Sequence, residues 1–165
     1  MGLEIERKFL IAVPSEEELL SKGATLKSIT QTYLLPSEGF PVRRVRSSVV
    51  EGVATYTYTA KRPASGEFSR VEEEHEITAN QYLELQKERD FELNVISKKR
   101  YALACENVLE IDIFSFSKRC AVLEIELPAE DAPYNIPSFI KVIKEVTTDY
   151  SYTNHSMAKR IPEDF

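Results

Sequence analysis

Cysteine, histidine and tryptophan are scarce in this chain of 165 residues, which has two cysteines, two histidines and no tryptophan. The two thiols, Cys105 and Cys120, are too few for the disulfide framework of a small secreted domain. They are not closely spaced, and so few histidines make a zinc site with Cys and His ligands unexpected. The composition therefore argues against disulfide scaffolds and zinc-binding modules.

Long hydrophobic runs are also missing. No segment approaches the roughly 20 apolar residues that a membrane-spanning helix needs. Charged residues follow Met1 almost at once, and the basic start and apolar stretch of a secretory signal are absent. We therefore expect a cytoplasmic protein without a membrane partner.

Positive charge is in deficit, because the net charge is −6 and the isoelectric point is about 5.1. Nucleic-acid-binding proteins usually carry a basic excess, so we expect no nucleic-acid partner. The length and the 42% content of hydrophobic residues suit one domain that spans residues 1–165.

What the chain has is a series of short segments in which polar and apolar residues alternate, the pattern of half-buried strands. Eight strands are expected, over residues 3–11, 29–35, 42–50, 53–62, 68–77, 95–104, 108–114 and 121–127. Helices are expected over residues 15–23, 78–88, 138–144 and, as a last turn, 154–160. Short connections between successive strands favour an antiparallel sheet that closes into a barrel. The predicted fold class is α+β, mainly β, an eight-stranded antiparallel closed barrel with a few covering helices.

One face of nearly every predicted strand is charged, because residues i and i+2 of a strand share a face. On any single strand this pattern is typical of a solvated face, but it recurs on seven strands and segregates by the sign of the charge. The predicted inward cations are Lys8, Arg44, Arg46, Lys61, Arg70, Lys98 and Arg100. The predicted inward carboxylates are Glu4, Glu6, Glu72, Glu74, Glu110, Asp112, Glu124 and Glu126, which brings the interior sum to −1.

Carboxylates that face cations suit a complex of divalent metal with polyphosphate. Mg²⁺ is typically bound by one or two carboxylates and by substrate phosphates, while Arg and Lys bind the remaining phosphate oxygens. Because the interior sum is negative, we expect the metal-free protein to bind phosphate poorly.

The charged segments follow one another in an order that resembles the CYTH superfamily, the triphosphate tunnel metalloenzymes. Residues 4–8 resemble its ExExK motif, residues 44–46 its RxR, and residues 59–61 its TxK. The later matches are residues 69–74 to SRxExE, 98–101 to KxRY, 110–114 to ExDxF, 124–127 to ExEL, and 145–154 to the closing segments. The match runs from end to end of the chain and is nearest to the short bacterial tripolyphosphatases.

This resemblance implies a triphosphate substrate, Mg²⁺ or Mn²⁺ as cofactor, and a hydrolase that uses metal-activated water. The metal ligands it implies are Glu4, Glu6, Glu124 and Glu126, with Asp112 added in a second tier. Glu4, Glu6, Glu72, Glu74 and Lys8 are the predicted catalytic residues, with Glu72 or Glu74 as proton acceptor. The seven inward cations are the predicted phosphate ligands.

Several functions stay open at this point. Inorganic tripolyphosphate is the favoured substrate, and thiamine or nucleoside triphosphate hydrolysis and class IV adenylyl cyclisation are the enzymatic alternatives. Ser151 stands where the family usually has a basic residue, which keeps a non-catalytic polyphosphate-binding module in consideration. A monomer and a homodimer are both compatible with the sequence.

Overall fold

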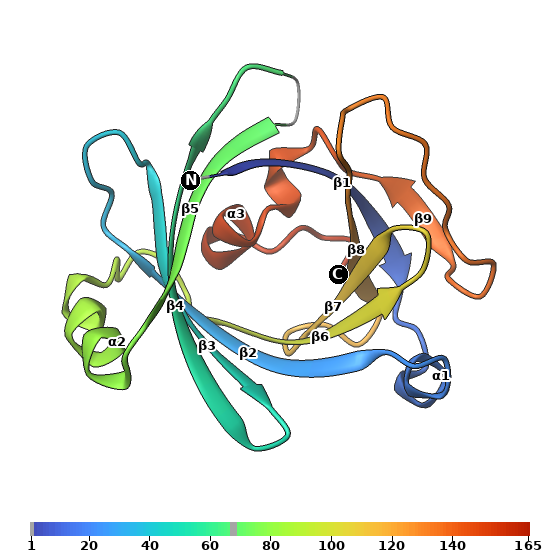
Figure 1. Ribbon diagram of the computed structural model, residues 1–165, viewed down its shortest axis with the longest axis horizontal. Helices are drawn as coiled ribbons and strands as arrows, with labels where there is room; N and C mark the ends of the chain where they lie inside the picture. Colours follow the sequence, from blue (N-terminus) through green and yellow to red (C-terminus); the bar gives the residue numbers. More distant parts are fainter. Residues whose placement is uncertain (1, 67–68) are drawn as a thin grey trace.

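The alternating segments form eight strands that close into an antiparallel barrel (Figure 1). The structure is a computed structural model that describes residues 2–66 and 69–165. The barrel strands are β1 (Gly2–Ala12), β2 (Thr25–Leu34), β3 (Val42–Val50), β4 (Val53–Pro63), β5 (Ser69–Ile77), β6 (Ile96–Ala104), β7 (Val108–Phe114) and β8 (Cys120–Glu126). Their order around the barrel is β5-β4-β3-β2-β6-β7-β8-β1, and pairing of β1 with β5 closes the ring. The predicted fold class is confirmed, although the predicted first residue of β5, at position 68, lies outside the described residues.

Three predicted helices are confirmed. Helix α1 (Glu16–Ser21) starts at Ser15, whose hydroxyl accepts a hydrogen bond from the Glu18 amide. Helix α2 (Ala79–Leu85) begins with a full capping box between Thr78 and Gln81 and continues into the 3₁₀ turn η1 (Gln86–Glu88). Helix α3 (Asn154–Lys159) follows the 3₁₀ turn η2 (Tyr150–Tyr152).

The predicted helix over residues 138–144 is wrong. Residues of this segment instead form β9 (Val142–Glu145), which pairs antiparallel with residues 9–11 of β1. Strand β5 occupies the same edge of β1 only along residues 2–5, so the rest of that edge is left for β9. Backbone hydrogen bonds to this edge outweigh a helical pattern that is only seven residues long.

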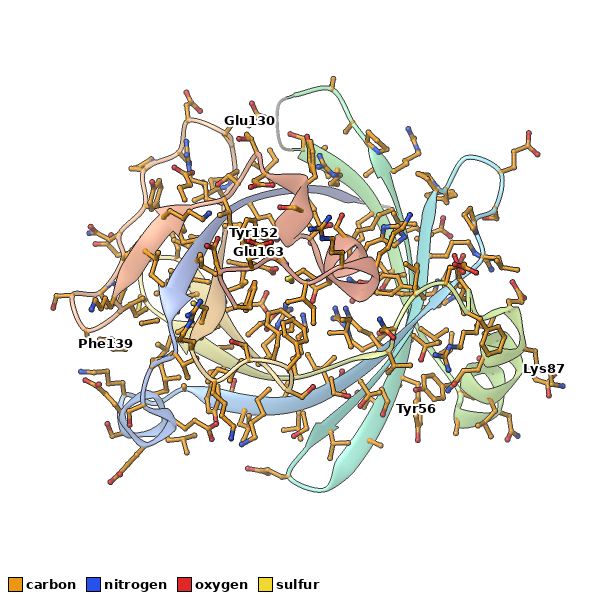
Figure 2. The ribbon with its side chains drawn as sticks, turned by 180° about the vertical axis from the view of Figure 1, so that it is seen from behind. Tyr56, Lys87, Glu130, Phe139, Tyr152 and Glu163 are labelled. Carbon is orange, nitrogen blue, oxygen red and sulfur yellow. The ribbon has the colours of Figure 1, made fainter. Side chains whose placement is uncertain are left out.

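The outer apolar faces of the barrel are covered by α1, α2 and residues 132–140. Ile111, Leu123 and Ile125 are fully buried under this cover, on the side of β1, β6, β7 and β8. On the opposite side α2 packs on β4, where the rings of Tyr56 and Tyr82 lie 4.8 Å apart. Lys87, beyond the end of α2, points away from the barrel (Figure 2).

Helix α3 lies across the interior of the ring (Figure 1). Its Met157 and Ala158 are buried against inward side chains of the strands, including Phe114 and Val122. An apolar layer therefore fills one level of the barrel, and the charged side chains occupy the remaining interior. Among the described residues, none of the helices has the length and apolar character needed to cross a membrane.

Candidate active site

The barrel interior holds a cavity of about 270 Å³ that is rich in charge. Seven cations and four carboxylates line it, which gives the lining a formal charge of +3. These residues are Glu4, Glu6, Lys8, Arg44, Arg46, Lys61, Arg62, Arg70, Arg100, Glu110 and Glu124. Uncharged residues of the lining include Tyr33, Val42, Thr147, Tyr150, Asn154 and His155.

The structure brings together most, but not all, of the predicted site residues. Within the described part of the chain, five of them do not line the cavity: Glu72, Glu74, Lys98, Asp112 and Glu126. Arg62, which was not predicted, does line it. The predicted net charge of −1 therefore does not apply to the cavity, whose lining is positive. A positive lining removes the reason for expecting the metal-free protein to bind phosphate poorly.

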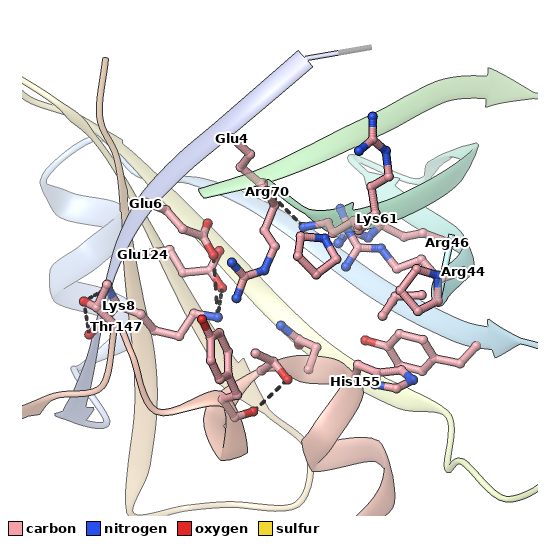
Figure 3. Close-up of a pocket in the computed structure, with 18 of the residues that line it drawn as sticks. Glu4, Glu6, Lys8, Arg44, Arg46, Lys61, Arg70, Glu124, Thr147 and His155 are labelled. Carbon is pink, nitrogen blue, oxygen red and sulfur yellow. Dashed lines mark hydrogen bonds and ion pairs between the residues drawn. The ribbon is translucent and has the colours of Figure 1, made fainter. Parts of the chain in front are cut away.

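One wall of the cavity carries two carboxylates that share a single lysine. The Nζ atom of Lys8 lies 3.6 Å from Oε1 of Glu6 and 3.6 Å from Oε1 of Glu124 (Figure 3). Antiparallel pairing of β1 with β8 sets this geometry, because Lys8 is directly opposite Glu124 and Glu6 is opposite Glu126.

The two carboxylates repel each other. Burial, together with the neighbouring charge of Glu124, raises the pKa of Glu6 to about 7. Burial would also raise the pKa of Glu124, but Lys8 and Arg100 outweigh it and lower that pKa. At neutral pH, Lys8 thus does not fully balance the charge of Glu6 and Glu124, and the pair can take up one further cation, either a proton or a metal ion.

The opposite wall carries arginines without carboxylate partners. Figure 3 shows Arg44 and Arg46 across the cavity from Glu6 and Glu124. In the described part of the chain no ion pair includes Arg44, Arg46 or Arg70. Burial and the nearby charges of Arg44 and Arg100 lower the pKa of Arg46 to about 10. This wall therefore presents positive charge to the cavity.

Lys61 lies between two further carboxylates at the end of the charged region. Its Nζ atom is 2.8 Å from Glu4 Oε2 and 3.1 Å from Glu72 Oε2. Burial, with Glu4 beside it, raises the pKa of Glu72 to about 7, whereas Lys61 overcomes burial and lowers the pKa of Glu4 to about 2. Glu4 therefore stays ionised and paired, and Glu72, which does not line the cavity, contacts the lining residue Lys61.

Asp112 is the hub of a buried ion-pair network. Lys98 donates to it at 2.5 Å, and Arg100 donates to both of its oxygens at 2.7 and 2.8 Å. The side chains of Lys98 and Asp112 are both fully buried. Arg100 also pairs with Glu110 and Glu124, which orients it toward the carboxylate wall. In this arrangement Asp112 and Lys98 position other groups and do not reach the cavity.

Two other predicted residues lie apart from the cavity. Glu126 is exposed at the end of β8. Glu74 accepts a hydrogen bond from Thr59 at 2.8 Å, beyond the reach of the cavity lining. The geometry thus separates Glu126 from Glu124, although the two share one face of β8.

The segment from Thr147 to His155 supplies a side of the cavity that strand patterns did not predict. Tyr150 covers the Arg70 guanidinium, whose Cζ lies 4.8 Å from the ring centroid. Asn154 accepts a hydrogen bond from Lys98 at 3.0 Å, which ties α3 to the ion-pair network. Ser151 is exposed and hydrogen-bonded to Asp149, so its position does not contribute to the lining.

Two of the three carboxylates that pair with Arg100, Asp112 and Glu110, allow a matched test of this network. We expect Asp112→Asn to lower the free energy of unfolding by about 3–5 kcal/mol, because it leaves the fully buried Lys98 without an ion pair and removes one partner of Arg100. Glu110→Gln should cost at most about 1 kcal/mol, because Glu110 is 32% exposed. Urea denaturation at pH 7 measures both, and equal losses would contradict the burial argument.

A second test uses the raised pKa of Glu6. The folded protein holds this proton more tightly than the unfolded chain does, so stability is lost as the pH rises from about 5 to about 8. Without metal, Glu6→Gln should be more stable than the wild type by about 1–3 kcal/mol at pH 8 and by less than about 1 kcal/mol at pH 5. Denaturant titrations at both pH values measure the difference. The control is Glu17→Gln, which removes a carboxylate from the exposed face of α1, away from the cavity. A change in stability of Glu6→Gln that is the same at both pH values would overturn the prediction.

Similarity to known proteins is found in the solved structures. No protein-family model and no curated protein matches the chain. A structure of the inorganic triphosphatase NE1496 is 26% identical, covers 98% of both chains and has a TM-score of 0.57. A structure described as the hypothetical protein NE1496 is 27% identical, covers 96% of this chain and 99% of that chain, and has a TM-score of 0.56.

A more distant neighbour shares the fold alone. The PH1819 protein from Pyrococcus horikoshii OT3 is 20% identical over 77% of this chain and 81% of its own, with a TM-score of 0.55. With its closed eight-stranded barrel and its ordered charged motifs, the chain resembles the short tripolyphosphatases of the CYTH superfamily, and its similarity to the two NE1496 structures agrees with that resemblance.

Proposed function

We propose that this chain is a metal-dependent hydrolase of triphosphates, with inorganic tripolyphosphate as its main substrate. One observation carries the proposal: among the described residues, a single cavity holds three arginines without ion pairs together with Glu6 and Glu124, two carboxylates that share one lysine. Arg44, Arg46 and Arg70 supply the charge that binds phosphate oxygens, often two at a time for each guanidinium. The similarity to a protein described as an inorganic triphosphatase supports this assignment.

The residues of the carboxylate wall fit a divalent cation. Glu6 and Glu124 offer hard oxygen ligands, and the raised pKa of Glu6 indicates that the pair lacks positive charge. In the described residues, three or more acidic, His or Cys side chains nowhere gather closely enough to hold a metal ion. Mg²⁺ commonly takes one or two protein carboxylates and completes its coordination with water and phosphate, which suits this pair. When bound, such an ion would neutralise phosphate charge and promote ionisation of a water molecule.

The chain's own residues provide binding and orientation. The arginine wall fixes the phosphate oxygens and stabilises negative charge that grows on the leaving group. Lys8, which lies between Glu6 and Glu124, keeps the two carboxylates in place. The cavity of about 270 Å³ is slightly smaller than sites for drug-sized ligands, at about 300–1,000 Å³, so it suits a small anion.

Phosphate release tests the proposal directly. We expect Mg²⁺- or Mn²⁺-dependent release from tripolyphosphate that exceeds release from ATP and thiamine triphosphate and that EDTA abolishes. Glu6→Gln and Glu124→Gln should each lower kcat by about 100-fold or more. The matched control is Glu126→Gln, which removes an exposed carboxylate of the same strand and should leave the rate within about twofold of wild type.

Three results would contradict this account. Undiminished release in EDTA would exclude metal dependence, and an equal loss in Glu126→Gln would move the carboxylate centre. Binding of tripolyphosphate without release from any substrate would identify a polyphosphate-binding module instead of an enzyme.

A further inference from the structure

The cations of the cavity differ in the kind of partner that orients them. Lys8, Lys61 and Arg100 each form ion pairs with carboxylates. Arg44, Arg46 and Arg70 form none among the described residues, as shown above. An arginine side chain has many rotamers, and ordering it costs conformational entropy that some contact must offset. Because these arginines form no ion pairs among the described residues, other contacts must hold their guanidinium groups in place.

Gln31 holds Arg46. Its Oε1 atom accepts hydrogen bonds from Nε and Nη2 of Arg46 at 3.3 and 3.2 Å. Its Nε2 atom donates to the hydroxyl of Tyr33 at 3.0 Å. Gln31 is fully buried, and the register of β2 with β3 sets it directly opposite Arg46. Both ends of the amide are therefore used to fix neighbours, and Gln31 itself does not line the cavity.

Arg70 is held in a similar way by groups without charge. Its Nη1 atom donates to the backbone carbonyl of Ser69 at 2.8 Å, and the ring of Tyr150 lies over its Cζ. For Arg44, the Nε atom is buried and has no hydrogen-bond partner among the described residues. Arg46 and Arg70 are thus both held by neutral partners.

A carboxylate at position 31 would orient Arg46 at least as well, because charge-assisted hydrogen bonds are roughly twice as strong as neutral ones. It would also cancel the charge of the guanidinium. A neutral amide orients Arg46 without neutralising it, at the cost of leaving a half-buried cation without an ion pair, and the lowered pKa of Arg46 is consistent with that cost. An anionic ligand would compensate the charge on binding.

We propose that Gln31 is a positioning residue that fixes Arg46 through its neutral amide and so keeps the positive charge of Arg46 available to an anionic substrate. The inference rests on the proposed function, because it assigns Arg46 to phosphate binding. It adds a residue that touches no substrate and whose lack of charge is the property that matters.

Gln31→Glu tests this idea because it keeps the shape of the side chain and adds one negative charge. The dissociation constant for inorganic tripolyphosphate, measured by titration calorimetry on metal-free protein at pH 8, should rise by about tenfold or more. The salt dependence of binding should fall, because one fewer cation takes part. The melting temperature should equal or exceed that of wild type, since the new carboxylate pairs with Arg46.

Three further variants make the test specific. Thr30→Glu places the same charge on the exposed neighbouring position of β2 and should change the dissociation constant by less than about threefold. Thr57→Glu places a carboxylate on β4, directly opposite Arg46, and leaves Gln31 intact. It should weaken binding as Gln31→Glu does, and it replaces that variant in the test if Gln31→Glu does not fold. Gln31→Met removes the hydrogen bonds that orient Arg46 but leaves the positive charge of Arg46 unchanged. It should lower the melting temperature and weaken binding less than Gln31→Glu does.

The outcomes separate this inference from the proposed function. Tight binding by the wild type with unchanged affinity in folded Gln31→Glu and Thr57→Glu overturns the inference alone. An equal loss in Thr30→Glu, or a greater loss in Gln31→Met than in Gln31→Glu, overturns it as well. Failure of the wild type to bind tripolyphosphate overturns the proposed function and this inference together.

Discussion

Closure of the sheet between β1 and β5 brings charged side chains from seven of the eight barrel strands into one interior, and buried charge is the constraint that organises the molecule. Removing an ion from water costs several kcal/mol unless a partner compensates it. Most interior charges meet this constraint by pairing, and Asp112 with Lys98 and Arg100 is the most buried example. The arginine wall does not meet it with carboxylates. That imbalance within an otherwise paired interior is why the cavity favours an anion.

The apolar groups reverse the usual arrangement of a globular protein. The outer faces of the strands form most of the core, under α1, α2 and residues 132–140, while one level inside the barrel is filled by α3 and its neighbours. The charged cavity therefore lies between two apolar layers, which lowers the local dielectric constant and strengthens every interaction within it. The same environment raises the pKa of Glu6, so the arrangement that binds an anion also prepares a site for a cation.

Much of this architecture follows from period-two alternation. The eight barrel strands, their closure and the inward direction of the charged faces were predicted because a one-residue shift would bury the wrong face of every strand. Strand β9 was missed because it depends on a free edge of β1, which is a tertiary property that residues 138–144 do not encode locally. Their apolar residues at positions 139, 140 and 143 fit a helix equally well.

The chemical character of the candidate site was predicted, but the position of each side chain along the barrel was not. Alternation assigns a side chain to the interior, but it does not say how far along the barrel the side chain lies or which partner it meets. Asp112 and Glu124 share an inward face with Glu126, yet the first is buried in ion pairs, the second lines the cavity and the third is exposed. The role of Tyr150 depends on how the chain crosses the barrel after β9, which no strand pattern contains.

The most direct measurement is a crystal structure of the protein grown with Mn²⁺ and a non-hydrolysable tripolyphosphate analogue, with the metal located by anomalous scattering. The account predicts phosphate oxygens on Arg44, Arg46 and Arg70 and a manganese peak beside Glu6 and Glu124. An anion in the separate pocket that includes Lys159 and Arg160, with no density on Arg44, Arg46 and Arg70, would contradict it.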